Sequence, residues 1–226
     1  MIVTVLLPTF YRPNGIKRTL DSLFSSITLD KKIQVKAVIA REIDDRKVED
    51  IVSEYNFSKC AVCPRPEQGP AYAWNVALFH ARNSDLYFLG SDDIVFHPGW
   101  LIEALREFEK LNYSGVVGCN DMSGKYERAG FSTQLLMSRD YMVEYNGGVA
   151  AYPFYYADYV DLEICVRAKA VNKFVYAKDS IVEHRWREVM DRGYEKVTPN
   201  ILQSMGKLYH QREHEGFPND FERIIK

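Results

Sequence analysis

Residues 86–100 read "LYFLGSDDIVFHPGW", in which two adjacent aspartates, Asp92 and Asp93, stand between two apolar runs. The first run has the composition of the end of a buried strand, and apolar character resumes at Ile94. Carboxylates at the edge of a core lose hydration and repel each other, so each of them needs a partner. The pair therefore raises the question of what this strand end holds.

The strand that precedes the aspartates belongs to a repeating pattern in the first 120 residues. Strand-like segments are expected at 2–8, 33–40, 59–63, 85–89 and 115–119, with apolar residues at helical spacing after each of the first four. Repeated β-α-β units predict an α/β fold with a doubly wound, mostly parallel sheet and right-handed crossovers. Ligands of such sheets bind beyond the carboxyl ends of the strands, which is where both aspartates stand.

The pattern becomes mixed after Asn120. We expect a strand at 131–137, a helix at 158–171, short strands at 173–177 and 180–184, and a last helix that begins after Thr198 and Pro199. No linker, repeat or low-complexity segment divides the chain, so we predict a single domain over residues 1–226.

Composition narrows the class of protein. The 226 residues are 46 % hydrophobic, which is enough for a sizeable core, and 29 basic against 31 acidic residues give a net charge of −2. That balance does not indicate nucleic-acid binding. No apolar stretch approaches the roughly 20 residues of a membrane helix, and the N-terminus alternates like a strand. Cys60 and Cys63 form a C-x-x-C that we interpret as part of a buried strand, and reduced thiols indicate a cytoplasmic protein.

An isolated Asp-Asp pair is ambiguous. Turns are rich in aspartate, so the pair alone fits a helix cap or a solvated loop better than a site. At a strand end, however, hard carboxylate oxygens suit Mg²⁺ or Mn²⁺, which bind through one or two carboxylates together with substrate phosphates. The rest of the chain decides between these interpretations.

Four segments together resemble family-2 glycosyltransferases of the GT-A fold. They are "VLLPTFYRP" (5–13), "PEQGPAYAWNVALFHARNSDLYFLGSDDIVFHPGWL" (66–101), "ADYVDLEICVRA" (157–168) and "VEH" (182–184). Their order is more specific than any one of them, and the resemblance spans roughly residues 2 to 187. It implies a nucleotide-binding half at 1–120 and an acceptor-binding and C-terminal half at 121–226.

The resemblance implies an inverting, metal-dependent enzyme that moves a sugar from a nucleotide-diphosphate donor, UDP-linked, to an acceptor hydroxyl of a glycan, a lipid-linked molecule or another compound. Asp93 and His184 would hold Mn²⁺ or Mg²⁺, and Asp158 would be the general base. The nucleotide-sugar would contact Pro8, Thr9, Phe10, Arg12, Glu42, Arg65, Gly69, Asn75, Ser91 and Asp92. The acceptor would contact Tyr156, Asp161 and Trp186. The last helix is a candidate interface in a homo-oligomer.

Several of these residues also have a simpler interpretation. His184 could be a surface histidine, and Asp158 and Asp161, which share a face if both lie on the helix, could be acids favoured by its dipole. Asp161 could also pair with Arg167. Arg65 could be a solvated loop residue, Gly69 an ordinary turn glycine, and Asn75 a residue that packs its helix against a loop. The aromatic side chains near 152–156 and Trp186 fit a core as well as a sugar site.

The chain also departs from the family pattern. "GSDD" replaces the commoner Asp-x-Asp, and "AREIDDRKVED" leaves open whether Glu42, Asp44 or Asp45 meets the base. "VEHRW" has Val182 where processive synthases carry Gln, which argues against polymer extrusion.

Three rival functions remain. A nucleotidyltransferase would have a Gly-rich basic loop after the first strand, which "TFYRPNG" supplies poorly. A sugar-nucleotide-binding protein could keep the fold without turnover. A glycosidase is disfavoured because two acids three residues apart on one helix rarely straddle a scissile bond.

Overall fold

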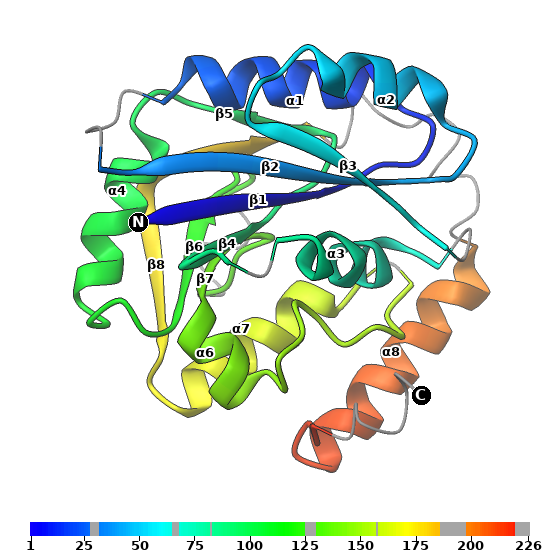
Figure 1. Cartoon of the computed structure of the whole chain (residues 1–226). Helices are drawn as coiled ribbons and strands as arrows, with labels where there is room; N and C mark the ends of the chain where they lie inside the picture. The colour runs from blue at the N-terminus through cyan, green and yellow to red at the C-terminus, as the bar shows by residue number, and fades with distance from the viewer. Residues whose placement is uncertain are drawn as a thin grey trace.

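A computed structural model describes residues 1–27, 32–64, 68–81, 83–124, 130–156, 158–185 and 198–219. Its described part is an α/β fold with helices on both faces of one sheet (Figure 1). In the view of Figure 1, α1 and α2 lie above the sheet, and α3, α6 and α7 lie below it.

The first half of the sheet matches the prediction. It contains β1 (Ile2–Pro8), α1 (Pro13–Ser25), β2 (Gln34–Arg41), α2 (Arg46–Ser53), β3 (Ser58–Val62), α3 (Pro70–Phe79) and β4 (Leu86–Leu89). The four strands lie in the order β3-β2-β1-β4, and all of their pairings are parallel. Their carboxyl ends therefore share one edge, at which Asp92 and Asp93 follow β4.

The second half adds antiparallel strands. It contains β5 (Ile94–Phe96), α4 (Trp100–Glu109), β6 (Val116–Asn120), β7 (Gln134–Ser138), α6 (Arg139–Tyr145), α7 (Val160–Ala170), β8 (Phe174–His184) and α8 (Pro199–His214). The order continues from β4 as β7-β6-β8-β5, with β7 antiparallel to both neighbours and β5 antiparallel to β8. The doubly wound fold is confirmed.

Three expectations for the second half were wrong. The two short strands are one strand, β8, whose pairing with β6 shifts register where exposed Lys178 and Asp179 interrupt it. The strand β5 was not expected. The helix α7 begins at Val160 rather than at Asp158, because Tyr159 takes a left-handed φ of 73° that α-helical residues do not adopt.

The sheet separates two apolar cores. Alternate residues of β1 point to opposite faces, so that Val5 and Leu7 meet α1 while Leu6 meets the α3 side. Both faces of β1 are covered, which explains its nearly continuous apolar sequence.

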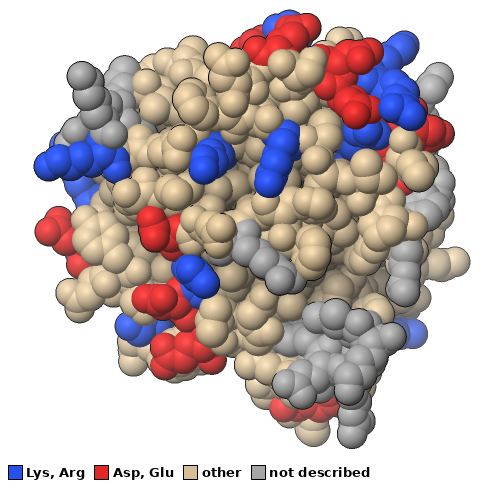
Figure 2. Space-filling view, viewed as in Figure 1, with Lys and Arg blue, Asp and Glu red and all other residues tan. Residues whose placement is uncertain are grey.

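Among the described residues, no helix is long and apolar enough to cross a membrane. Figure 2 shows that, on the face in view, charged side chains gather at the upper right, over α2, and again at the left and lower left, with a largely uncharged area between them.

Residues 150–156, the aromatic loop, are held against α3. The amide of Asn75 donates to the carbonyl of Ala151 (2.8 Å), and its oxygen accepts from the N–H of Ala150 (2.9 Å). Gly69, just before α3, has φ 82° and ψ 174°. A Cβ on Gly69 would lie 2.1 Å from the carbonyl oxygen of Tyr156. The loop therefore approaches α3 so closely that only glycine fits there.

The close approach predicts that Gly69→Ala loses much more stability than Gly99→Ala. Gly99 also precedes a helix and has φ 84°, but its added Cβ would meet nothing within 4 Å. We expect about 1 kcal/mol for Gly99→Ala and at least about 3 kcal/mol for Gly69→Ala, because the latter combines a conformation essentially restricted to glycine with a backbone clash. Denaturant unfolding of the two variants measures the difference, and equal losses would contradict the close packing of the loop.

Candidate functional site

Pairing between β5 and β8 brings His184 to the aspartates. The register places Ile94 opposite His184, so the last residue of β8 lies beside the start of β5. The N–H of Arg185 donates to the carbonyl of Asp93 (2.8 Å), which extends the contact past the strand. As a result, His184 Nε2 lies 3.4 Å from Asp93 Oδ1. Residues 91 positions apart are thus joined by a strand of three residues that the sequence did not reveal.

Asp92 is held from the end of β1. Thr9 Oγ1 donates to Asp92 Oδ2 and Arg12 Nη1 donates to Asp92 Oδ1, each at 2.7 Å. Asp92 is 3 % exposed, and its burial raises its pKa to about 7, although Arg12 opposes the rise and Asp93 adds to it. The resemblance implied that Arg12 contacts the nucleotide-sugar. In the structure its guanidinium lies against Asp92, with Nη2 4.0 Å from Asp93 Oδ2.

Asp93 is held mainly by His184 and Ser91. Ser91 Oγ donates to Asp93 Oδ1 at 2.5 Å. Burial alone would raise the pKa of Asp93, but the hydrogen bond and charge of His184 and the Ser91 hydroxyl outweigh it and lower that pKa. Burial opposes protonation of His184, yet Asp93 raises the pKa of His184 above its ordinary value. We call Thr9, Arg12, Ser91, Asp92, Asp93 and His184 the aspartate site.

The donor set of the aspartate site fits a divalent cation. Among the described residues, no group of three His, Cys, Asp or Glu could hold a metal. Asp93 and His184 would supply two protein ligands, which suffices for an ion that completes its coordination with phosphate oxygens and water. A carboxylate together with an imidazole suits Mn²⁺ better than Mg²⁺, which prefers oxygen ligands alone.

The two acids near the start of α7 differ in their surroundings. Asp158 is exposed and precedes the helix, so the two side chains do not share a helical face as we expected. Asp161 is partly buried in the first turn and accepts from the N–H of Leu162 (2.9 Å). Burial raises the pKa of Asp161 to about 6; Asp158 adds to the rise and His184 opposes it. Asp161 is therefore within electrostatic reach of the aspartate site.

Arg167 is not the partner of Asp161 in the described contacts. Its guanidinium instead pairs with Glu163, with Nη1 3.3 Å from Oε1. Glu163 is itself buried, so this pair lies away from solvent.

The acids after β2 contact Tyr11. The hydroxyl of Tyr11 donates to Asp44, and its N–H donates to Asp45 Oδ2 (3.1 Å). Asp45 also caps α2 by accepting from the N–H of Val48. Glu42 is buried at the carboxyl end of β2. The hydrogen bond to Asp44 raises the pKa of Tyr11 to about 12, so the ring is a neutral donor at this edge.

The remaining predicted residues divide into three groups. Pro8 ends β1, and Phe10 stands beside it with its ring edge-on to Tyr11 at 4.9 Å between centroids. Gly69 and Asn75 hold the aromatic loop, so the packing interpretation of Asn75 agrees with its contacts, and Tyr156 lies at the end of that loop. Arg65 and Trp186 lie outside the described residues.

Asp121 is a further acid beside His184 that was not predicted from the sequence. It follows β6, is 4 % exposed, and its carbonyl accepts from the N–H of His184 (3.1 Å). Thr133 Oγ1 donates to its side chain (3.1 Å). Asp121 stands directly after a predicted strand, so the rule that selected Asp92 and Asp93 could have found it.

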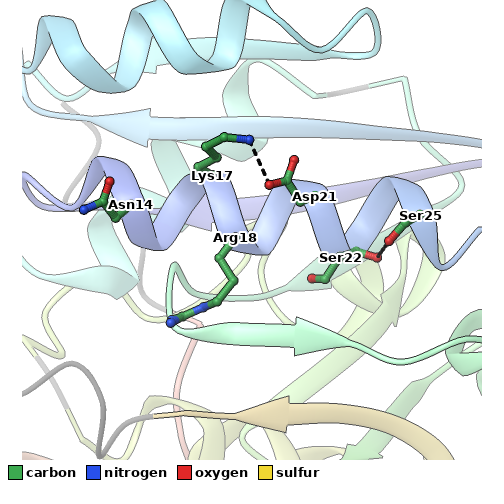
Figure 3. Close-up of a pocket in the computed structure, with 6 residues that line it drawn as sticks. All are labelled: Asn14, Lys17, Arg18, Asp21, Ser22 and Ser25. Atoms are coloured by element: carbon green, nitrogen blue, oxygen red, sulfur yellow. Dashed lines mark hydrogen bonds and ion pairs between the residues drawn. The ribbon is translucent and has the colours of Figure 1, made fainter.

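A shallow hollow lies elsewhere on the surface. It has a volume of about 620 Å³ and is lined by one side of α1: Asn14, Lys17, Arg18, Asp21, Ser22 and Ser25 (Figure 3). Lys17 and Asp21 form an ion pair of 2.9 Å across its wall. The hollow shares no residue with the aspartate site, and we assign it no part in the chemistry.

Comparisons with known proteins give a family match and a set of similar folds. The sequence model of glycosyl transferase family 2 matches residues 4–156, which is more than half of the chain. A search of curated proteins found no match.

Solved structures show the same fold at low sequence identity. S. aureus TarS 1-349 has a TM-score of 0.64 at 15% identity, over 80% of this chain and 59% of that chain. The same protein in complex with UDP-GlcNAc has a TM-score of 0.60 at 15% identity, over 80% and 57%. Mannosyltransferase PcManGT from Pyrobaculum calidifontis, in complex with GDP-Man and Mn2+, has a TM-score of 0.65 at 17% identity, over 85% and 58%. The chain thus spans less than two thirds of the length of each of them.

The burial of Asp92 predicts a large stability loss for Arg12→Met. The side chains of Arg12 and Asp92 are 12% and 5% exposed, so removing the guanidinium leaves a buried carboxylate without its main counter-charge. We expect a loss of about 3 kcal/mol in the free energy of unfolding, and adding Asp92→Asn should restore about half of it. The control is Arg106→Met, whose pair with Glu103 is exposed and should contribute about 0.5 kcal/mol or less. Denaturant unfolding of the variants measures these losses. Equal losses in the free energy of unfolding for Arg12→Met and Arg106→Met would contradict the buried pair.

Proposed function

Since the chain belongs to glycosyl transferase family 2, we propose that it transfers a sugar from a nucleoside-diphosphate donor to an acceptor hydroxyl with inversion at the anomeric carbon. The observation that carries the proposal is the pairing of Asp93 with His184 at the carboxyl edge of the sheet, with Asp161 within electrostatic reach of His184. A diphosphate needs a concentrated positive charge there, and an acceptor hydroxyl needs a base.

The donor would occupy the edge formed by β1, β2 and β4. Phe10 and Tyr11 offer aromatic surface to a base, and Glu42 stands at the end of β2. We favour a UDP-linked sugar, which has support from the complex of TarS with UDP-GlcNAc. The complex of PcManGT with GDP-Man makes a guanine donor the alternative to test.

Asp93 and His184 are the residues that would hold Mn²⁺ or Mg²⁺. When bound, the ion supplies positive charge that stabilises the departing nucleoside diphosphate. Asp92 has its two oxygens taken by Arg12 and Thr9, so we assign it to orienting the loop and the ribose rather than to the ion.

We propose Asp161 as the general base, in preference to Asp158, which the sequence favoured. Asp161 is partly buried and senses the charge of His184, whereas Asp158 is exposed to solvent, which would compete for the same proton. A carboxylate whose pKa is raised toward neutrality is a better proton acceptor at working pH. As Asp161 takes the proton of the acceptor hydroxyl, the acceptor oxygen bonds to the anomeric carbon and the bond from that carbon to the diphosphate breaks. This direct displacement inverts the anomeric centre.

The assignment of the base predicts different losses for two isosteric variants. Asp161→Asn should lower kcat by about 100-fold or more while the donor KM stays within about twofold, because only the proton acceptor is removed. Asp158→Asn should retain at least about a third of kcat. Release of nucleoside diphosphate measures both. A large loss in Asp158→Asn with activity kept in Asp161→Asn would return the role to Asp158.

Donor binding can be tested without knowing the acceptor. We expect UDP to bind the wild-type protein in the presence of Mn²⁺ and to lose at least about tenfold in affinity in Asp93→Asn, because a ligand to the ion is removed. Glu103→Gln on α4, a partly exposed acid away from the site, is the control. Calorimetric titrations with UDP, GDP and dTDP also identify the nucleobase of the donor that the protein prefers. If none of the three binds with Mn²⁺, the proposal fails, and release of pyrophosphate would instead indicate a nucleotidyltransferase.

A further inference from the structure

A buried ion pair ties the C-terminal helix to the helix that carries Asp161. Arg212 of α8 donates from Nε to Glu163 Oε2 (2.9 Å) and from Nη2 to Oε1 (2.8 Å). Both side chains are 3% exposed. This is the parallel, two-bond geometry in which arginine binds a carboxylate most strongly. Most other residues of α8 are exposed, and only Tyr209 and Arg212 are buried.

The same guanidinium also contacts the aromatic loop. The Cζ atom of Arg212 lies 3.4 Å from the centroid of the Tyr152 ring, at cation–π distance. Tyr155 donates its hydroxyl to Glu163 Oε2 (2.8 Å). Arg212 therefore links α8 directly to Tyr152 at the beginning of the aromatic loop. It also links α8 to Tyr155 at the end of the loop, because Arg212 and Tyr155 both donate to Glu163.

The rest of α8 covers the segment between the loop and α7. Tyr209 stacks on Tyr159, with 5.3 Å between centroids and 29° between planes. The N–H of Tyr156 points to Met205 Sδ (3.1 Å). In Figure 1, α8 lies beside α7 and away from the strands of the sheet. The covered segment includes Tyr159, the left-handed residue between Asp158 and Asp161.

This arrangement makes the position of the two acids depend on α8. The aromatic loop has no strand or helix of its own, and α3 holds it through apolar packing, the close contact at Gly69 and the hydrogen bonds of Asn75. A left-handed tyrosine persists only where its surroundings hold it, and the surroundings of Tyr159 include α8. The donor edge, by contrast, is built from β1, β2 and β4, and none of the contacts described for α8 reaches it.

We propose that Arg212 is a positioning residue for sugar transfer: through Glu163 and Tyr152 it fixes the aromatic loop and the start of α7, and with them Asp161. The inference rests on the proposed function for the reaction that it serves. It assigns α8, which lies beyond the residues matched by the family model, to the acceptor side of the site.

The proposal predicts a split between kcat and donor KM. In Arg212→Met, nucleoside diphosphate release from whichever UDP-, GDP- or dTDP-sugar the wild type uses should lose about 10- to 100-fold in kcat, because the base is displaced. The donor KM should stay within about twofold. Arg212→Lys keeps the charge but loses the two-bond geometry, so its kcat should fall between those of the wild type and Arg212→Met. Lys207→Met, an exposed cation on the same helix, is the control and should match the wild type.

Hydrogen exchange on the full chain supplies a readout that needs no substrate. Amides of residues 152–161 should exchange at least about tenfold faster in Arg212→Met than in the wild type, while those of β1 and β4 stay unchanged. If Arg212→Met does not fold, Arg212→Lys and Met205→Ala carry the same comparison. Unchanged exchange at 152–161 would overturn the proposal, as would a donor KM that rises in step with the fall in kcat. A wild type without turnover would instead refute the proposed function, and the exchange experiment would still decide the role of Arg212.

Discussion

The structure is organised around the cost of burying two adjacent carboxylates. Asp92 and Asp93 are each 3% exposed at the end of β4, and neither could remain there charged without compensation. Each carboxylate receives its compensating partners from a different part of the chain. Arg12 and Thr9 come from the end of β1 and serve Asp92, whereas His184 comes from the end of β8 and serves Asp93. The parallel half of the sheet and its antiparallel extension therefore meet at these two side chains.

This division gives the two carboxylates different capacities. Asp92 is occupied by hydrogen bonds that hold the loop after β1, so its main effect is on the shape of the edge. Asp93 faces an imidazole that can exchange a hydrogen bond for a shared cation, as carboxylate and histidine ligands do. In the proposed function, adjacent residues of one sequence motif thus serve structure and chemistry separately.

Much of the first half was predictable from sequence because its apolar strand segments alternate regularly along the chain with segments of helical spacing. The run at 86–89 and the aspartates after it located the edge of the sheet correctly. The second half was harder for identifiable reasons. Three residues, Ile94–Phe96, are too few for a strand pattern, and Lys178 and Asp179 hide the continuity of β8 behind a polar interruption.

Side-chain roles were least accessible where partners are far apart in sequence. Arg212 and Glu163 are 49 residues apart, and nothing local marks either as half of a buried pair. The choice between Asp158 and Asp161 depended on where α7 begins, and the backbone of Tyr159 sets that point. The contacts of Asn75, in contrast, agree with its simplest interpretation.

The most direct test of the central claim is crystallographic. Crystals containing Mn²⁺ and a nucleoside diphosphate should be measured at the manganese absorption edge. We expect an anomalous peak for an ion within bonding distance of Asp93, His184 and the diphosphate oxygens, with Arg12 still paired with Asp92. A peak that bridges Asp92 and Asp93 without His184, or an ordered diphosphate away from the carboxyl ends of β1 and β4, would contradict the account.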